Sequence, residues 1–388
     1  MLALGNGVVM TGFMMLLPLL PRYISQLSFN DFQIGILVAS FFAGRVLFEF
    51  PVGIVSDYIG RRLVMWAALS LSAVATAAYA LTTTPELMMF FRLLQGVAAS
   101  AFVVGSQAYI NDCTPMELRG LANGINSSAI NIGVIVGPLL AGFLSQAYSI
   151  GTPFWIGGAL AAVCLFLSLR IPEVSFSQAP GKPPRPDRYF LKELLAPVIS
   201  RRSFALSMIH FLQWMGITIF LTMAPILTAE KLGWGVGLVA VALAASGAVS
   251  AISSPTLGQL SDRQGRIGVM MTGLIIMGLE SLAVLFHPGT ALTIAAFAVG
   301  GLGAPAYFNS FLSLIGDVTR PFERGAVTGF IGSFGEWGSI IGSAVAAPLL
   351  WHAISTEAPM AFDAVVFFAC VLLVLASRAL LRAPAEPL

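Results

Sequence analysis

Charged residues are scarce in this chain. Its 388 residues include 20 lysines and arginines and 18 aspartates and glutamates, together 10% of the sequence, against about 25% in an ordinary soluble domain. Apolar residues make up 57%. A soluble fold of this size cannot hide so much apolar surface, and intrinsic disorder requires a far lower hydrophobicity. Both classes are therefore excluded.

Cysteine, histidine and runs of basic residues are also rare. The three cysteines, Cys113, Cys164 and Cys370, are scattered through apolar segments and form neither a disulfide framework nor a zinc spacing. A net charge of +2 without a Lys/Arg stripe excludes a nucleic-acid partner. Because the chain has three histidines, no nucleophile elbow and no phosphate-binding Gly-Lys-Ser/Thr loop, we expect no enzyme, no ATP-driven pump, no cofactor and no metal.

Long apolar runs are what the chain has in abundance. A spanning helix needs about 20 mostly apolar residues, whereas a membrane β-barrel needs alternating segments of about ten residues, and none is visible. The sequence therefore predicts an all-α polytopic membrane protein with twelve transmembrane helices. We expect them at residues 3–23, 33–56, 63–82, 86–111, 120–148, 152–171, 203–229, 235–257, 267–286, 290–316, 325–351 and 360–382.

A polar linker divides the apolar runs into two sets of six. Residues 172–202 are rich in proline and basic residues, so we predict an N-terminal six-helix bundle over 1–171 and a C-terminal one over 203–388. When alternate loops are assigned to opposite sides, 16 of the 20 basic residues fall on the side of the linker. By the positive-inside rule, the linker and both termini are predicted to be cytoplasmic.

The two halves repeat each other without a gap at an offset of 205 residues. Gly53, Asp57 and Gly60 match Gly258, Asp262 and Gly265. An even number of helices separates the copies, which predicts a parallel repeat about a pseudo-two-fold axis along the membrane normal. The other matches are Arg61 with Arg266, Gly96 with Gly301, Asp112 with Asp317, Arg119-Gly120 with Arg324-Gly325, and Gly124, Gly133 and Gly137 with Gly329, Gly338 and Gly342.

The repeated loop carries a family resemblance. Gly53-x3-Asp57-x2-Gly60-Arg61-Arg62 resembles the signature loop of the major facilitator superfamily, and Gly258-x3-Asp262-x2-Gly265-Arg266 resembles its weaker second copy. Asp57 can accept hydrogen bonds from a helix N-terminus or pair with a basic side chain, and Gly60 permits a tight turn. We expect these charged residues to latch the two halves in one state; the alternative is a short polar turn. The predicted gating residues are Gly53, Asp57, Gly60, Arg61, Arg62, Asp262, Gly265, Arg266, Gly133, Gly137 and Pro138.

Two further motifs narrow the resemblance. Arg92-x2-Gln95-Gly96 is similar to the fourth-helix motif of proton-coupled members, and Gly124-x8-Gly133-x3-Gly137-Pro138 is similar to the antiporter motif of the twelve-helix drug:proton antiporters. Ala98 and Ala141 stand where those motifs usually have glycine. The resemblance covers the whole chain and implies a monomer. Gly133 and Gly137 also form a small-residue face for close helix packing, which is the alternative interpretation of the second motif.

Ionisable residues inside predicted spans are candidates for function because each costs roughly 2.5–3.5 kcal/mol to insert. Glu49 and Glu336 are the predicted proton carriers, and Arg45 and Arg92 are predicted to adjust their protonation. The alternatives are a static Arg45–Glu49 ion pair, a Glu336 hydrogen-bonded across helices, and an Arg92 tied to backbone carbonyls. Glu280 is predicted to be mainly structural.

Amides and aromatic residues on the inner helices predict a cavity for an amphipathic organic molecule. His210 either joins this cavity or lies in solvent near a helix end. The predicted substrate-binding residues are Gln107, Tyr109, Asn126, Asn131, Gln213, Trp214, Tyr307, Asn309 and Glu336.

The resemblance and the buried charges together predict a secondary transporter of the cell membrane that works by alternating access. It would exchange protons for a small organic molecule and export it; its partners are that molecule, protons and the lipid bilayer. Two alternatives stay open. One is a proton symporter or uniporter that imports an anionic metabolite, and the other is a non-transporting receptor or lipid-handling protein on the same fold.

Overall fold

A computed structural model describes residues 2–15, 31–82, 84–172, 198–234, 236–286, 289–320 and 323–382. These residues are almost entirely helical and contain no strand. Most of the predicted linker 172–202 lies outside the described residues, as does the part of the predicted span 3–23 that follows residue 15. The all-α fold predicted from the apolar runs is confirmed.

Every predicted span has a helical counterpart among the described residues. Most described helix ends fall within a few residues of the predicted spans, because Gly, Pro and polar residues interrupt the apolar pattern there. The helix predicted at 235–257 differs, since it continues to Gln264. The first half contains α1 (Leu2–Met14), α3 (Asp31–Ile59), α4 (Arg61–Ala78), α5 (Pro85–Cys113), α6 (Arg119–Ala147) and α7 (Thr152–Ser168).

In the second half, two of the predicted spans are interrupted helices. The span 290–316 breaks at Gly301, where a Cβ atom would meet the carbonyl oxygen of Ser246, and the span 325–351 contains a π-helical segment. The helices are α9 (Arg201–Leu232), α10 (Val236–Gln264), α11 (Arg266–Phe286), α12 (Thr290–Gly300), α13 (Gly303–Val318), α14 (Arg324–Ile340), the π segment η4 (Ile341–Ala346), α15 (Ala347–Ala353) and α16 (Ala358–Arg382).

The helices have the length and composition of membrane spans. Among the described residues, 7 helices are long and apolar enough to cross a bilayer, and Leu2–Gly12 and Thr152–Ser168 are shorter apolar helices. Large apolar side chains such as Leu139, Ile252 and Leu372 are exposed, as expected where lipid replaces water as the solvent. The chain is a multi-pass membrane protein.

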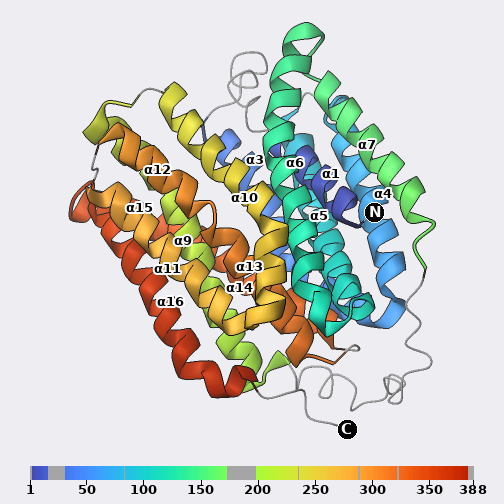
Figure 1. Cartoon of the computed structure of the whole chain (residues 1–388). Coiled ribbons are helices and arrows are strands. Elements are labelled where there is room, and N and C mark those ends of the chain that lie inside the picture. The colour runs from blue at the N-terminus through green and yellow to red at the C-terminus, as the bar shows by residue number, and fades with distance from the viewer. Residues whose placement is uncertain are drawn as a thin grey trace. The chain divides into compact units, whose positions relative to one another are not determined.

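The helices group into two compact units. Unit 1 consists of Met1–Cys113, Ser128–Arg185 and Pro321–Gly329, and unit 2 of Thr114–Ser127, Pro186–Arg320 and Phe330–Leu388. In unit 1, α5 packs against α3 and α4; in unit 2, α16 lies beside α9 and α11, as Figure 1 shows.

Each unit includes the start of a helix from the other half of the sequence. The beginning of α14 belongs to unit 1 and the beginning of α6 belongs to unit 2. These short segments carry the residues on which the functional site depends. The division into bundles at 1–171 and 203–388 stays a prediction.

Candidate functional site

In unit 1, Asp57 binds the N-terminus of α14. One carboxylate oxygen of Asp57 accepts a hydrogen bond from the amide of Gly325 at 3.0 Å, and the other accepts one from the amide of Ala326 at 2.7 Å. The first amides of a helix have no partner within the helix and carry partial positive charge. A buried carboxylate at this position therefore satisfies two of them at once.

Arginines complete this network. Arg61, one turn after Asp57, forms an ion pair with it and donates from Nε to Asp112 at 3.3 Å. Arg324, at the start of α14, pairs with the other oxygen of Asp112 and donates to the carbonyl of Asn111 at 3.2 Å. Arg61 is 2% exposed. Its burial is tolerated because two carboxylates neutralise it.

In unit 2, the residues that match at the offset of 205 form the same network. Asp262 accepts from the amides of Gly120 at 2.8 Å and Leu121 at 2.9 Å, at the N-terminus of α6. Arg266 forms an ion pair with Asp262 and donates from Nε to Asp317 at 3.0 Å. Arg119 completes it with a bond of 2.7 Å to Asp317. Each network therefore joins a loop motif of one half of the sequence to a helix start of the other.

Glycines bring the backbones together within each network. A Cβ atom at Gly53 would meet the carbonyl oxygen of Gly325, and one at Gly258 would meet that of Gly120. Gly60 and Gly265 adopt φ values of 98° and 97°, a conformation that is favourable only for glycine. The matching geometry explains why the motif needs glycine at these positions.

Arg62 lies outside these networks. Its guanidinium stacks over the ring of Trp66 at 4.1 Å and donates to the carbonyl of Leu169 at 3.2 Å, at the end of α7. The structure thus places Arg62, a predicted gating residue, in a contact that joins α4 to α7.

The predicted proton-coupling residues of unit 1 are buried in two places. Glu49 is 3% exposed and lies 3.5 Å from Arg45, one turn earlier on α3. Arg92 is 1% exposed on α5; it donates to Gln95 at 2.6 Å and stacks over the ring of Phe41 at 4.9 Å. The ion pair of Arg45 with Glu49 is present, and Arg92 is held between α3 and α5.

An aromatic cluster surrounds His210 in unit 2. The imidazole stacks on Phe311 at 4.8 Å, its Nδ1 lies 3.3 Å from the hydroxyl of Tyr307, and the indole of Trp214 donates to its Nε2 at 3.2 Å. His210 is buried, so the interpretation that it lies in solvent is wrong. Its ring is enclosed because the aromatic residues of α13 pack on this face of α9.

Glu336 lies on α14, whose glycines pack on the same part of α9. A Cβ atom at Gly335 would lie 2.7 Å from both His210 and Trp214. Glu336 is 4% exposed. The structure therefore brings α14 at Glu336 close to Trp214, a predicted substrate residue, and to His210 on α9.

The remaining predicted substrate residues are distributed over both units. Gln213 is fully buried on α9, and Asn309 on α13 donates to the carbonyl of Ser254 at 2.8 Å. The hydroxyl of Tyr109 donates to the carbonyl of Pro172 at 2.7 Å, at the end of α7. Asn126 belongs to unit 2, whereas Gln107, Tyr109 and Asn131 belong to unit 1.

The antiporter-like motif packs α6 on α1. A Cβ atom at Gly133 would meet the carbonyl oxygen of Gly7, and one at Gly137 would lie 2.7 Å from that of Thr11. Pro138 lies inside α6, which continues to Ala147. The small residues thus bring two backbones of unit 1 into contact.

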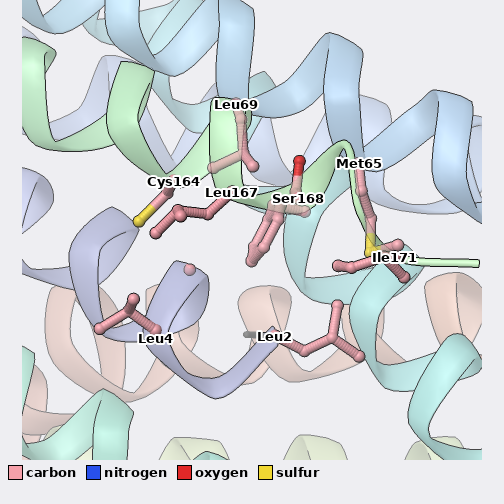
Figure 2. A pocket seen from close by; sticks show the side chains of 10 residues that line it. Leu2, Leu4, Met65, Leu69, Cys164, Leu167, Ser168 and Ile171 are labelled. Carbon is pink, nitrogen blue, oxygen red and sulfur yellow. The ribbon is translucent and has the colours of Figure 1, made fainter.

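A pocket in unit 1 lies away from these groups. Apolar side chains of α1, α4, α5 and α7 line it, and Figure 2 shows Leu2, Leu4 and Leu167 around the opening with Ser168 as a polar neighbour. None of its lining residues is a predicted substrate, gating or proton-coupling residue. Its lining is mostly apolar, as in a packed core, so we assign it no part in the functional site.

The family model of the Major Facilitator Superfamily matches residues 2–266 and 206–387 of this chain, which covers both halves. The chain belongs to the major facilitator superfamily. It is therefore a transporter of that family.

Named relatives of this major facilitator protein include drug resistance proteins. Multidrug resistance protein 1 of Bacillus subtilis (strain 168) is 26% identical over 343 residues, which cover 86% of each chain. Quinolone resistance protein NorA of Staphylococcus aureus (strain MRSA252) is 23% identical over 377 residues, 96% of this chain and 94% of that protein.

Solved structures of the superfamily share the fold. The proton:xylose symporter XylE has a TM-score of 0.80 at 15% identity, covering 97% of this chain and 94% of that chain. The human organic anion transporter MFSD10 (TETRAN) has a TM-score of 0.77 at 18% identity, covering 96% and 97%. At these identities the likeness concerns the fold alone.

Sequence reasoning did not place four members of the networks in the site. Asp112, Arg119, Asp317 and Arg324 are the partners of the loop arginines. All four match at the offset of 205 residues, so the signal was present in the repeat. What the repeat alone does not show is which residue of one half meets which residue of the other.

Proposed function

We propose that the protein exports a small amphipathic organic molecule across the cell membrane in exchange for protons. The observation that carries the proposal is the pair of matched networks at Asp57 and Asp262, each of which joins the two halves of the sequence. A protein that transports by alternating access has to break and remake such contacts, whereas a receptor or scaffold needs neither. The named multidrug and quinolone resistance relatives support an organic molecule as the cargo.

In this mechanism the networks act as gates. While the carboxylates hold the helix N-termini, the ends of α6 and α14 are closed against the loop motifs. Opening leaves four aspartates, two helix termini and four arginines to be solvated, so the networks open where water can reach them. The excess of basic residues on this side supports a cytoplasmic location for this end of the helices and for both termini.

Glu49 and Glu336 carry the protons in this proposal. A buried glutamate is costly to ionise unless a cation is near, and Arg45 lies within 3.5 Å of Glu49. The carbonyl oxygen of Glu49 contacts Gly329 of α14, so opening the gate changes the surroundings of Glu49. We expect deprotonation on the cytoplasmic side to favour loading of the cargo, and protonation on the outside to favour its release.

The aromatic cluster at His210 supports an amphipathic cargo. Trp214, Tyr307 and Phe308 offer ring faces with centroid separations of 5.3 to 5.5 Å between neighbours, and Gln213 and Asn309 supply amides on the same two helices. Apolar walls with a few polar groups are typical of sites for organic molecules. In this proposal the protein works as a monomer.

The proposal is tested in liposomes that enclose a pH dye. The protein is reconstituted, a pH gradient is imposed, and cationic, neutral and anionic organic compounds are added in turn. We expect at least one amphipathic compound to drive protons in the direction opposite to its own movement. If none of the compound classes causes proton movement, proton coupling is wrong.

One observation favours a second function. The guanidinium of Arg92 is buried on α5, and a buried cation suits the binding of an anionic metabolite imported with protons. The same assay separates the two functions, because a symporter moves protons and solute in one direction. An anionic compound that acidifies the liposome interior as it enters identifies import and overturns export.

A further inference from the structure

A buried polar cluster lies in unit 2, apart from the predicted coupling residues. Asp363 on α16 is fully buried, and its Oδ2 lies 2.7 Å from the hydroxyl of Ser281 on α11. Among the described residues, its Oδ1 has no hydrogen-bond partner. A Cβ atom at Gly216 of α9 would lie 3.0 Å from that oxygen, so the carboxyl group is enclosed between three helices.

The contacts of Ser281 indicate which state of Asp363 fits this enclosure. The Ser281 oxygen lies 2.7 Å from Asp363 Oδ2 and 3.0 Å from the carbonyl oxygen of Met277. A hydroxyl has only one hydrogen to donate. Both contacts are satisfied when Asp363 is a neutral acid whose O–H donates to Ser281, while Ser281 donates to Met277.

A second carboxyl group acts on the first. Glu280 precedes Ser281 on α11; its carboxyl group lies against Gly300 of α12 and interacts electrostatically with Asp363. None of the ion pairs between described residues includes Glu280 or Asp363. Asp363 is fully buried and Glu280 is partly buried. Two carboxylates in such surroundings without a cation repel each other, so one proton is retained between them.

An unpartnered amide points to a ligand beside the acids. Gln213 is fully buried, and within the part of the chain that the structure describes neither its Oε1 nor its Nε2 has a hydrogen-bond partner. It lies on α9 between Ile209, whose carbonyl accepts from Cys370 of α16, and Gly216, which contacts Asp363. Residues at this spacing share a helix face, so Gln213 is on the face that covers α16. Buried amides and acids of this kind are usually bridged by water.

We propose that Asp363, Glu280 and Gln213 form a second protonation site, which binds one proton and a bridging water and releases that proton during the transport cycle. The titratable groups that face it are Glu280 from α11, Cys370 further along α16, and His210 with Tyr307 beyond Gln213. Its part in transport rests on the proposed proton coupling, whereas the protonated state of Asp363 does not.

Infrared spectroscopy of the protein in lipid nanodiscs tests the site. At neutral pH the wild-type protein has a carbonyl band of a neutral carboxylic acid, and Asp363→Asn lacks it. Glu230→Gln, which removes an exposed carboxylate on α9, keeps the band. Ser281→Ala and Gln213→Leu keep the acid and shift its band, because Ser281 bonds to the acid directly and Gln213 reaches it through the proposed bridging water. These two variants keep the test valid where Asp363→Asn misfolds.

Three outcomes overturn the proposal: a wild-type spectrum without the band, a band unchanged in Asp363→Asn, or loss of the band when sodium is added at constant pH, which identifies a metal cation site. Proton movement in liposomes is measured in parallel with the infrared spectra. A band that is present while no compound drives protons leaves the site standing and removes the proposed coupling. Full proton movement in a protein without the band removes the proposed site and leaves the proposed coupling standing.

Discussion

At the scale of single residues, Asp57 and Asp262 have requirements that no other side chain meets. Each carboxylate accepts from two successive amides of a helix N-terminus with its two oxygens. Asparagine has the same shape, but one oxygen is replaced by an NH2 group that opposes an amide N–H. It also lacks the charge that the helix terminus and the adjacent arginine stabilise.

We therefore expect Asp262→Asn to weaken the network of unit 2. Hydrogen bonds to charged groups contribute about 1.5–3 kcal/mol each, so loss of one shifts the gate equilibrium by about tenfold or more. Transport of an organic compound into liposomes should fall accordingly, with normal amounts of folded protein.

Glu357→Gln is the matched control for Asp262→Asn. Glu357 forms an ion pair of 2.5 Å with Lys231, whose hydrogen bond lowers the pKa of Glu357 to about 2. Both partners are accessible to solvent, where an ion pair contributes little. The control should transport at the wild-type rate; an equal loss in both variants would contradict a gate at Asp262.

Gly258 is predicted to tolerate no side chain. A Cβ atom there meets the carbonyl of Gly120, whereas one at Gly268 meets nothing within 4 Å. Overpacking costs about 1–3 kcal/mol, while alanine in an open helix position is more favourable than glycine by about 1 kcal/mol. Thermal unfolding in detergent should show a lower Tm for Gly258→Ala and an equal or higher one for Gly268→Ala. Equal Tm values for the two variants would contradict the close contact at Gly258.

At the scale of helices, the apolar runs predict existence and approximate ends but not internal breaks. The spans 290–316 and 325–351 were predicted as single helices because their hydrophobicity is uniform. The π segment η4 and the break at Gly301 arise from contacts with α9 and α10: a Cβ atom at Gly342 would lie 2.5 Å from the carbonyl of Met215, and one at Gly301 would meet that of Ser246. A hydrophobicity pattern does not predict tertiary contacts of this kind.

Three glycines of α14 and η4 form one stripe along α9. Gly335, Gly338 and Gly342 each approach α9 closely, at His210 and Trp214, at Phe211 and at Met215. The spacing of three and four residues was visible in the sequence. Its partner was not, because many helices of a membrane bundle carry glycines at this spacing.

We expect Gly338→Ala to separate α14 from α9. The added Cβ atom meets the carbonyl of Phe211, and relief requires movement of the helix that carries Glu336. Transport should fall at least severalfold while the protein still folds, since the strain of about 1–3 kcal/mol is local. Liposome flux measures the effect, with Gly142→Ala as control, because a Cβ atom at Gly142 meets nothing within 4 Å. Unchanged flux in Gly338→Ala would show that the stripe does not position Glu336.

At the scale of the whole molecule, the repeat predicts that the two networks are alike. It does not predict that each network joins residues from both halves of the sequence. The offset of 205 residues pairs Asp57 with Asp262 and Arg119 with Arg324. A repeat places equivalent residues in equivalent surroundings, and both networks follow that rule. It does not specify that each loop motif holds the helix start of the other half, because this depends on the packing of the halves, which no local pattern encodes.

The two networks share no residue, yet we expect them to open together. Each joins the same two halves of the sequence, so a movement that separates the halves at one network strains the other. Asp57→Asn should therefore speed hydrogen exchange at Gly325 and Ala326, which lose their acceptor, and also at Gly120 and Leu121, whose acceptor Asp262 is intact. A shift of about 1.4 kcal/mol corresponds to about tenfold faster exchange.

Hydrogen exchange followed by mass spectrometry resolves these segments, and Asp262→Asn supplies the reciprocal measurement. In a single gate, the rate at Gly120 and Leu121 rises in Asp57→Asn, and the rate at Gly325 and Ala326 rises in Asp262→Asn, because one opening exposes the amides of both networks. Faster exchange confined to the mutated network in both variants would instead mean two independent latches. The loop motif and its repeat would then hold different steps of the cycle.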